Sequence, residues 1–134
     1  MDNGVSAMSM LEITVQNFEP EVTKPGIVVI DFWAAWCAPC RRFGPIFAAA
    51  AERHPDVRWG KVDTEAQPAL AEAFEIRSIP TLMVFRDGIR VFAQAGALPA
   101  AALDDLVRQA RALDMVEICT QLEAARQPSS SRLN

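Results

Sequence analysis

The chain has 134 residues, of which 51% are hydrophobic and 22% are charged, and its formal net charge is −4 at pH 7. This length and composition predict one globular domain with a substantial core and exclude a disordered chain. The acidic balance argues against binding to nucleic acid or to an anionic membrane, and no window is apolar for long enough to span a bilayer.

The beginning of the chain carries no strong structural signal. Residues 1–10 have no basic segment followed by an apolar run, so they predict a flexible leader and not a secretory signal. Three cysteines, one more than a pair, fit a reducing compartment better than a secreted domain stapled by disulfides. We therefore expect a cytoplasmic protein, and we also expect it to be a monomer.

A central strand is the strongest early prediction. Residues 11–14 predict a short edge strand and residues 17–22 a short helix, after which Pro25-Gly26 turns the chain. Residues 27–33 are apolar and β-branched or aromatic except for Asp31. This pattern is typical of a strand that is covered on both faces.

Two cysteines open the next helix, which should extend to His54 and kink at Pro45. The three-residue spacing of Cys37 and Cys40 places both sulfurs on one side of the first turn, where they can form a disulfide. At the helix N-terminus, unpaired backbone N–H groups and the helix dipole lower the pKa of the Cys37 thiol. Cys40, one turn deeper, should be more covered and act as the resolving thiol.

The alternatives for this pair are a structural disulfide or half of a zinc site. Structural zinc requires four Cys or His ligands in paired spacings, and beside Cys37 and Cys40 the chain offers only Cys119 and His54. A cytosolic C-x-x-C at a strand–helix junction is more typical of redox chemistry. We expect no metal.

The remaining elements predict an α/β fold with a mixed central sheet. Strands are expected at residues 57–63, 79–85 and 89–95, and helices at 67–75 and 99–113. The first crossover makes 27–33 and 57–63 parallel, and Asp87-Gly88 predicts a tight hairpin between the last two strands. The sheet should have about five strands, the last two antiparallel, with helices on both faces.

A further helix is expected at residues 114–126, followed by a disordered tail at 127–134. Asp114 and Glu117 have the spacing of a capping box, and the helix has an apolar stripe of Met115, Ile118, Cys119 and Leu122. We favour a helix that packs back on its own domain, with Cys119 as a half-buried filler; the alternative is a helix that binds a partner.

Several motifs resemble the thioredoxin family. Residues 31–40, Asp-Phe-Trp-Ala-Ala-Trp-Cys-Ala-Pro-Cys, resemble the thioredoxin active-site segment, and residues 78–82, Ser-Ile-Pro-Thr-Leu, its substrate-facing loop. The match continues through residues 85–88 and 96–98, and it covers about residues 10–113. The chain is most similar to the second bacterial type of thioredoxin, without the N-terminal zinc module of that type. It departs from the family at Ala38, where glycine is usual.

The resemblance implies a thioredoxin fold over residues 11–113 and a buried acid at Asp31. That carboxyl would have a raised pKa and act through water as a base for Cys40. Lys61 resembles the lysine that the family places near this acid. The residues alone leave two alternatives open: Asp31 could end its strand in solvent, and Lys61 could be a surface lysine with a buried stem.

The resemblance also implies a substrate surface. Pro80 resembles the cis-proline that faces the disulfide, and it would leave the Ile79 backbone free to pair with an extended substrate. Trp36, Gly96 and Ala97 would complete a flat apolar patch around the Cys37 sulfur. Trp36 could instead belong to the core.

These features predict a thiol–disulfide oxidoreductase that reduces disulfides in cytoplasmic proteins. The resemblance implies recycling by a thioredoxin reductase-like flavoprotein that carries the NADPH and flavin sites. This chain has no glycine-rich dinucleotide fingerprint and should need no bound cofactor. Two alternatives remain: a disulfide oxidase or isomerase of the same fold, and a binding or chaperone module without redox turnover.

Overall fold

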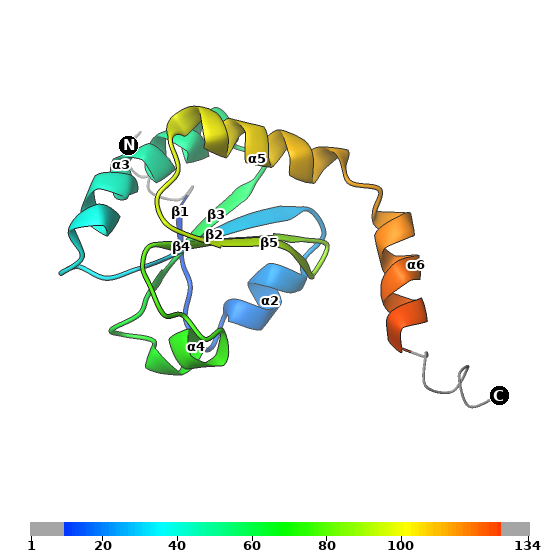
Figure 1. Ribbon diagram of the computed structural model, residues 1–134, viewed down its shortest axis with the longest axis horizontal. Helices are drawn as coiled ribbons and strands as arrows, with labels where there is room; N and C mark the ends of the chain where they lie inside the picture. Colours follow the sequence, from blue (N-terminus) through cyan, green and yellow to red (C-terminus); the bar gives the residue numbers. More distant parts are fainter. Residues whose placement is uncertain (1–9, 127–134) are drawn as a thin grey trace.

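The structure is a computed structural model and describes residues 10–126. Its centre is a five-stranded sheet with the strand order β1-β3-β2-β4-β5 (Figure 1). The strands are β1 (Met10–Glu12), β2 (Ile27–Trp33), β3 (Arg58–Asp63), β4 (Thr81–Arg86) and β5 (Ile89–Ala95). The helices are α2 (Phe18–Thr23), α3 (Ala38–Arg53), α4 (Pro68–Ala73), α5 (Ala100–Ala112) and α6 (Met115–Arg126).

The sheet is mixed, as the sequence predicts. β3 pairs in parallel with both β1 and β2, because helical connections return the chain to the same end of the sheet. β4 is antiparallel to β2, and β5 is antiparallel to β4. β2 is therefore central, and every residue of it except Trp33 is buried.

Helices cover both faces of the sheet. In Figure 1, α3 and α5 lie on one side of the sheet, and α2 and α4 lie on the other. The first core joins the two larger helices to the sheet through aromatic and branched side chains, among them Phe43, Phe47, Trp59 and Leu103. The second core lies toward the smaller helices and contains Phe32. Because β2 is buried on both faces, its position is fixed, and the segment that contains Cys37 begins at its end.

The β4–β5 turn is the predicted tight hairpin. Asp87 and Gly88 both have positive φ, 53° and 86°, which a type I′ turn requires. The Asp87 carboxylate also accepts a 2.7 Å hydrogen bond from the Gly26 N–H. One side chain thus ties the hairpin to the start of β2.

The end of α4 has an unusual backbone. Glu75 follows the helix with φ at 53°, in the left-handed region that glycine adopts more easily than other residues. Phe74, at the end of the helix, packs its ring against Phe18, Phe32 and Phe85. The preceding ring is thus anchored in the core while Glu75 turns the chain.

The C-terminal helix α6 forms where the sequence predicts it, and Asp114 Oδ1 accepts a 3.1 Å hydrogen bond from the Glu117 N–H. The prediction that it packs back on its domain is wrong. No residue of α6 is buried, Val116 and Leu122 are 78% and 44% exposed, and Cys119 is exposed and not half-buried. Figure 1 shows α6 extending away from the sheet.

The direction in which the chain leaves α5 explains why α6 does not pack on the domain. Leu113 ends α5 with an extended backbone, φ −64° and ψ 140°. The Arg86 guanidinium donates to the carbonyls of Ala110 and Leu113 at 2.7 and 3.0 Å, which fixes the end of α5. The next helix therefore begins beyond the edge of the sheet.

Met10 belongs to β1 and not to a leader, whereas the rest of the predicted leader and the predicted tail at 127–134 lie outside the described residues. Within residues 10–126, no helix combines the length and the apolar character needed to cross a membrane.

Candidate active site

The active-site turn begins at the end of β2 and leads directly into α3. Cys37 is the N-cap of α3, with extended backbone angles of φ −86° and ψ 113°. Its sulfur accepts a 3.2 Å hydrogen bond from the Cys40 N–H. The two cysteines form a disulfide with their Cα atoms 5.2 Å apart. Pro39 lies in the first turn of the helix, as the sequence predicts, where its missing N–H removes no helical hydrogen bond.

The two sulfurs face different surroundings. As whole residues Cys37 and Cys40 are both 3% exposed, so the expectation that Cys40 is the more covered one is wrong at this level. Cys37 nevertheless lines an open groove that Cys40 does not line. The Cys37 sulfur also lies 3.6 Å from the carbonyl oxygen of Ile79. Of the two cysteines, Cys37 is thus the one next to the groove.

The groove beside Cys37 has a volume of about 440 Å³. Trp36 forms one wall and is 67% exposed, which rules out the alternative that it is a core residue. Its indole N–H donates a 3.1 Å hydrogen bond to the Glu65 carboxylate. Residues 76–79 also line this groove. An aromatic ring is therefore held at the surface next to the reactive sulfur.

The loop before β4 has the expected backbone. The Ile79–Pro80 peptide bond is cis, and the Gly96 N–H donates a 2.7 Å hydrogen bond to the Pro80 carbonyl. Gly96 and Ala97 are exposed, Ile79 is half-buried and Pro80 is buried. Gly96 has φ at 105°, so its position favours glycine. The contacts of Ile79 with Cys37 and of Gly96 with Pro80 connect the predicted patch residues.

Asp31 lies below this surface and is fully buried, so the alternative in which it ends its strand in solvent is wrong. Neither carboxyl oxygen has a hydrogen-bond partner among the described residues. Burial disfavours the charged form and raises the pKa of Asp31 to about 7, although the positive charge of Lys61 acts in the opposite direction. The carboxyl therefore changes protonation state near neutral pH.

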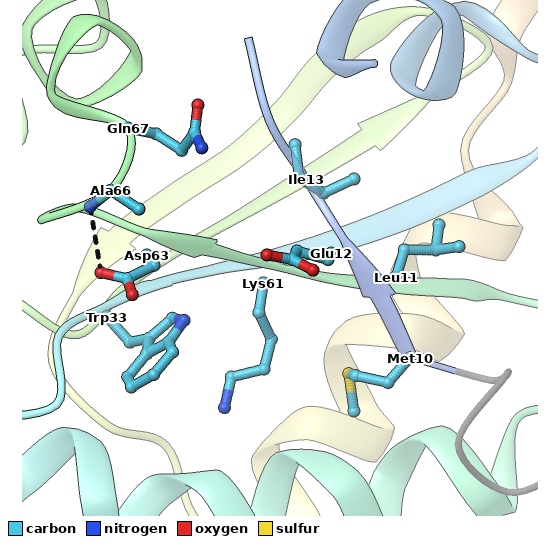
Figure 2. Close-up of a pocket in the computed structure, with 9 residues that line it drawn as sticks. All are labelled: Met10, Leu11, Glu12, Ile13, Trp33, Lys61, Asp63, Ala66 and Gln67. Atoms are coloured by element: carbon cyan, nitrogen blue, oxygen red, sulfur yellow. Dashed lines mark hydrogen bonds between the residues drawn. The ribbon is translucent and has the colours of Figure 1, made fainter. Parts of the chain in front are cut away.

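Lys61 lies opposite Asp31 in the β2–β3 register. Figure 2 shows its side chain running beside Trp33 toward α3. The ammonium lies 4.5 Å from the centroid of the Trp33 ring, an arrangement that stabilises a cation. An adjoining cavity of about 200 Å³ is lined by Glu12, Asp63 and Lys61 among others (Figure 2). Lys61 is half-buried, and its ammonium points toward α3 (Figure 2).

Two further points concern residues outside the predicted site. No group of three or more His, Cys, Asp or Glu side chains suited to a metal ion occurs between residues 10 and 126, and His54 lies at the opposite end of α3 from Cys37. Sequence reasoning missed Arg77, which among the described residues is the one charged residue that lines the groove beside Cys37. Its position directly before the 78–82 motif was the available signal.

A comparison with protein-family models identifies the thioredoxin family over residues 9–109, which is most of the chain. The chain belongs to the thioredoxin family. Among curated relatives, a putative thioredoxin 2 of Streptomyces coelicolor is 59% identical over 110 residues, covering 82% of each chain. Thioredoxin 1 of Synechococcus elongatus is 44% identical, covering 68% of this chain and 87% of its own.

A solved structure agrees with the fold. It comes from a study of thiol resolution in yeast mitochondrial 1-Cys peroxiredoxin through the glutathione and thioredoxin systems. The matching chain has a TM-score of 0.70 and 28% sequence identity, and the match covers 76% of this thioredoxin and 96% of that chain. The predicted family and α/β fold are both confirmed.

The family and the geometry together establish the type of chemistry. The Cys37–Cys40 disulfide occupies the active-site position of a thioredoxin. The protein is therefore a thiol–disulfide oxidoreductase with protein-disulfide reductase activity, as the sequence predicts. Its substrates are disulfide-containing proteins, and a reductase partner returns the pair to the dithiol form.

Proposed function

We propose that this thioredoxin reduces cytoplasmic protein disulfides, with Cys37 as the attacking thiol and Cys40 as the resolving thiol. The observation that carries the proposal is the position of Cys37, at the N-cap of α3 and on the wall of the groove. A cytoplasmic location is supported by Cys119, an exposed and unpaired thiol that persists most readily in a reducing compartment.

The first step is attack by the Cys37 thiolate on one sulfur of a substrate disulfide. A bond forms between Cys37 Sγ and that sulfur, the substrate S–S bond breaks, and the other substrate sulfur leaves as a thiolate. In the reduced protein, the N–H groups at the start of α3 and the helix dipole favour negative charge on Cys37. The attacking species is thereby available near neutral pH.

The second step releases the product. Asp31, with its pKa near 7, accepts the Cys40 proton through a water molecule. The Cys40 sulfur then attacks Cys37 Sγ, the mixed disulfide breaks, and the second substrate sulfur leaves as a thiolate. Two electrons have passed to the substrate, and the protein holds the Cys37–Cys40 disulfide.

Other residues position these reactants. Lys61 lowers the pKa of Asp31 and so keeps a fraction of the carboxyl ionised at neutral pH. The Ile79 backbone, 3.6 Å from Cys37 through its carbonyl, pairs with an extended substrate segment. Trp36, Pro80, Gly96 and Ala97 surround that segment with apolar surface.

Regeneration requires an external donor of electrons. We assign this role to an NADPH-dependent flavoprotein of the thioredoxin reductase type, which carries the nicotinamide and flavin, while this chain acts as a monomer without a bound cofactor. Residues 11–113 form the redox domain, and α6 is an addition to it.

A trapping experiment tests the assignment of roles. All variants should carry Cys119→Ser, because Cys119 is exposed and would otherwise form its own adducts. We expect Cys40→Ser to accumulate mixed disulfides with cytoplasmic proteins, since the resolving thiol is gone, and Cys37→Ser to accumulate almost none. Non-reducing gels and mass spectrometry give the measurement.

The opposite result would reverse the roles of the two cysteines. Cys37→Ser/Cys40→Ser is the control, since it should neither trap proteins nor reduce disulfides. If this double variant complemented the loss of the wild-type protein in cells, the protein would act as a binding module and the reductase proposal would fail.

A further inference from the structure

A second groove adjoins the groove beside Cys37. The two share Ile76, Arg77 and Ser78 as lining residues. The second groove, of about 310 Å³, extends over Met83 on β4 and onto β5, the strand at the edge of the sheet. A polypeptide whose disulfide reaches Cys37 can therefore continue beyond residues 76–78 onto β5.

Two arginines line this path without partners. Arg77 lines both grooves and Arg90 lines the second, and both are exposed. No hydrogen bond or ion pair joins either guanidinium to another residue of the described chain. Most arginines elsewhere are engaged, as shown by Arg53 with Asp104 and Arg111 with Asp56. Arg77 and Arg90 are thus free to bind an external anion.

The charge of the path contrasts with that of the whole protein. The formal net charge is −4, yet within residues 10–126 Arg77 is the one charged residue on the wall of the active-site groove. In the second groove Glu75 offsets one of the two arginines and leaves one net positive charge. A guanidinium binds a carboxylate with two parallel hydrogen bonds, which favours arginine over a simple point charge for this purpose.

We propose that Arg77 and Arg90 select substrates in which an extended segment next to the disulfide carries Asp or Glu. The proposal rests on the reductase function assigned above and adds the chemical class of the preferred substrate. The net charge of −4 disfavours an acidic segment on average over the protein, whereas the two arginines favour it along this path.

Synthetic disulfides provide a direct test. Two eight-residue peptides, each dimerised through one central cysteine, differ only in having Asp and Glu or Asn and Gln beside that cysteine. Pre-reduced protein freed of other reductants is mixed with excess peptide, and the rate is followed by tryptophan fluorescence. Each turnover converts the protein dithiol to a disulfide and the peptide disulfide to two thiols. Dithiothreitol gives the intrinsic reactivity of each peptide, by which its rate is corrected.

We expect the corrected rate for the acidic peptide to exceed that for the neutral peptide by about fivefold at low ionic strength, the range open to two exposed ion pairs. The preference should shrink in 0.5 M salt, because screening weakens exposed pairs. Arg77→Gln/Arg90→Gln should abolish it, so that this variant reduces the two peptides at equal corrected rates. Arg108→Gln/Arg126→Gln, which also removes two positive charges but from α5 and α6, should retain it.

The results that would refute the inference differ from the result that would refute the proposed reductase function. Equal corrected rates for both peptides, or an unchanged preference in Arg77→Gln/Arg90→Gln, would refute selection by this path. An equal loss in Arg108→Gln/Arg126→Gln would attribute the preference to net charge alone and refute it as well. Failure of the wild-type protein to reduce either peptide would remove the reductase function and the inference with it.

Discussion

At the scale of single residues, Asp31 combines a structural cost with a chemical role. It is fully buried, and neither of its carboxyl oxygens has a partner among the described residues. A buried and unpartnered carboxylate destabilises a folded protein, whereas the protonated form is tolerated more easily. The same burial that costs stability places the pKa where proton transfer to and from Cys40 is possible at neutral pH.

The loss of stability that the buried Asp31 carboxyl causes should depend on pH. The pKa of Asp31 is raised from 3.8 to about 7, so between these values the folded protein binds more protons than the unfolded chain and loses stability as pH rises. The full cost, present above pH 7, is about 4 kcal/mol at about 1.4 kcal/mol per pKa unit. We expect Asp31→Asn to match the wild type near pH 4 and to be more stable by up to about 4 kcal/mol at pH 8. Urea unfolding of the oxidised proteins measures the difference.

A related variant provides the control. Lys61→Gln removes the positive charge that lowers the pKa of Asp31, so the loss of wild-type stability should continue to a higher pH in this background. A stability difference between Asp31→Asn and the wild type that does not vary from pH 4 to pH 8 would contradict the assignment of this titration to Asp31.

At the scale of elements, the end of α4 shows a local conflict between residue and backbone. Glu75 has φ at 53° directly after Phe74, whose ring contacts the rings of Phe18, Phe32 and Phe85. The packed ring fixes where the chain must turn, and the turn then imposes a left-handed conformation on the next residue. For a residue with a Cβ this conformation costs about 1 kcal/mol or more.

Replacing this residue by glycine should stabilise the protein. Glycine adopts positive φ without the steric cost, although its greater freedom in the unfolded chain offsets part of the gain. We expect Glu75→Gly to raise the free energy of unfolding by about 0.5 kcal/mol, read as a higher Tm in thermal unfolding.

The matched control lies one turn earlier. Glu72→Gly, at an exposed position inside α4, should lower the stability by about 1 kcal/mol, because glycine is a poor helix former. A loss of stability in both variants would show that Glu75 makes a contribution that its backbone angle does not describe.

The elements themselves were largely predictable from sequence, because their signals are local. The apolar run of β2, the Cys37 N-cap and the Asp87-Gly88 turn each depend on a few adjacent residues. The packing of α6 was not predictable in the same way. Its capping signal is local, but its direction depends on the extended backbone of Leu113 and on hydrogen bonds from Arg86, which is distant in sequence.

The residues of the candidate site differ in the same way, because some have a local sequence signal and others depend on contacts between distant segments. The cysteines and Asp31 interrupt or end recognisable patterns, so sequence alone identified them. Arg77 directly precedes the 78–82 motif, but it was missed because its exposed guanidinium, without a partner among the described residues, lines a groove that exists only after folding. Lys61 was identified, whereas its contact with Trp33 required the register of β2 and β3.

At the scale of the whole molecule, the redox domain and α6 are spatially separate. Figure 1 shows α6 on the opposite side of the molecule from the start of α3, where Cys37 lies. None of its residues is buried. Because stability depends mainly on buried apolar surface, α6 should contribute little to the folding of the rest.

Truncation after Asp114 tests this independence. It keeps the Leu113 carbonyl, to which Arg86 donates. We expect the free energy of unfolding to change by less than about 0.5 kcal/mol, as for other surface changes, and the rate of peptide disulfide reduction to stay the same. Thermal unfolding measures the stability, and the peptide assay followed by tryptophan fluorescence measures the rate.

A truncation that removes more of the chain makes the comparison informative. Ending the chain after Gln109 removes buried Ala110 and carbonyl acceptors of Arg86, so this variant should lose stability clearly. If truncation after Asp114 were equally damaging, α6 would have a structural role that its exposure does not reveal.

The exposed position of Cys119 has a practical consequence for following this protein in mixtures. In the oxidised state the chain has one reduced thiol, since its other two cysteines form the Cys37–Cys40 disulfide. An alkylating reagent should therefore add one label to the oxidised protein and three labels to the denatured reduced protein. Cys119 acts as an internal reference for complete labelling. The intact mass therefore gives the fraction of molecules whose Cys37–Cys40 pair is in the dithiol form.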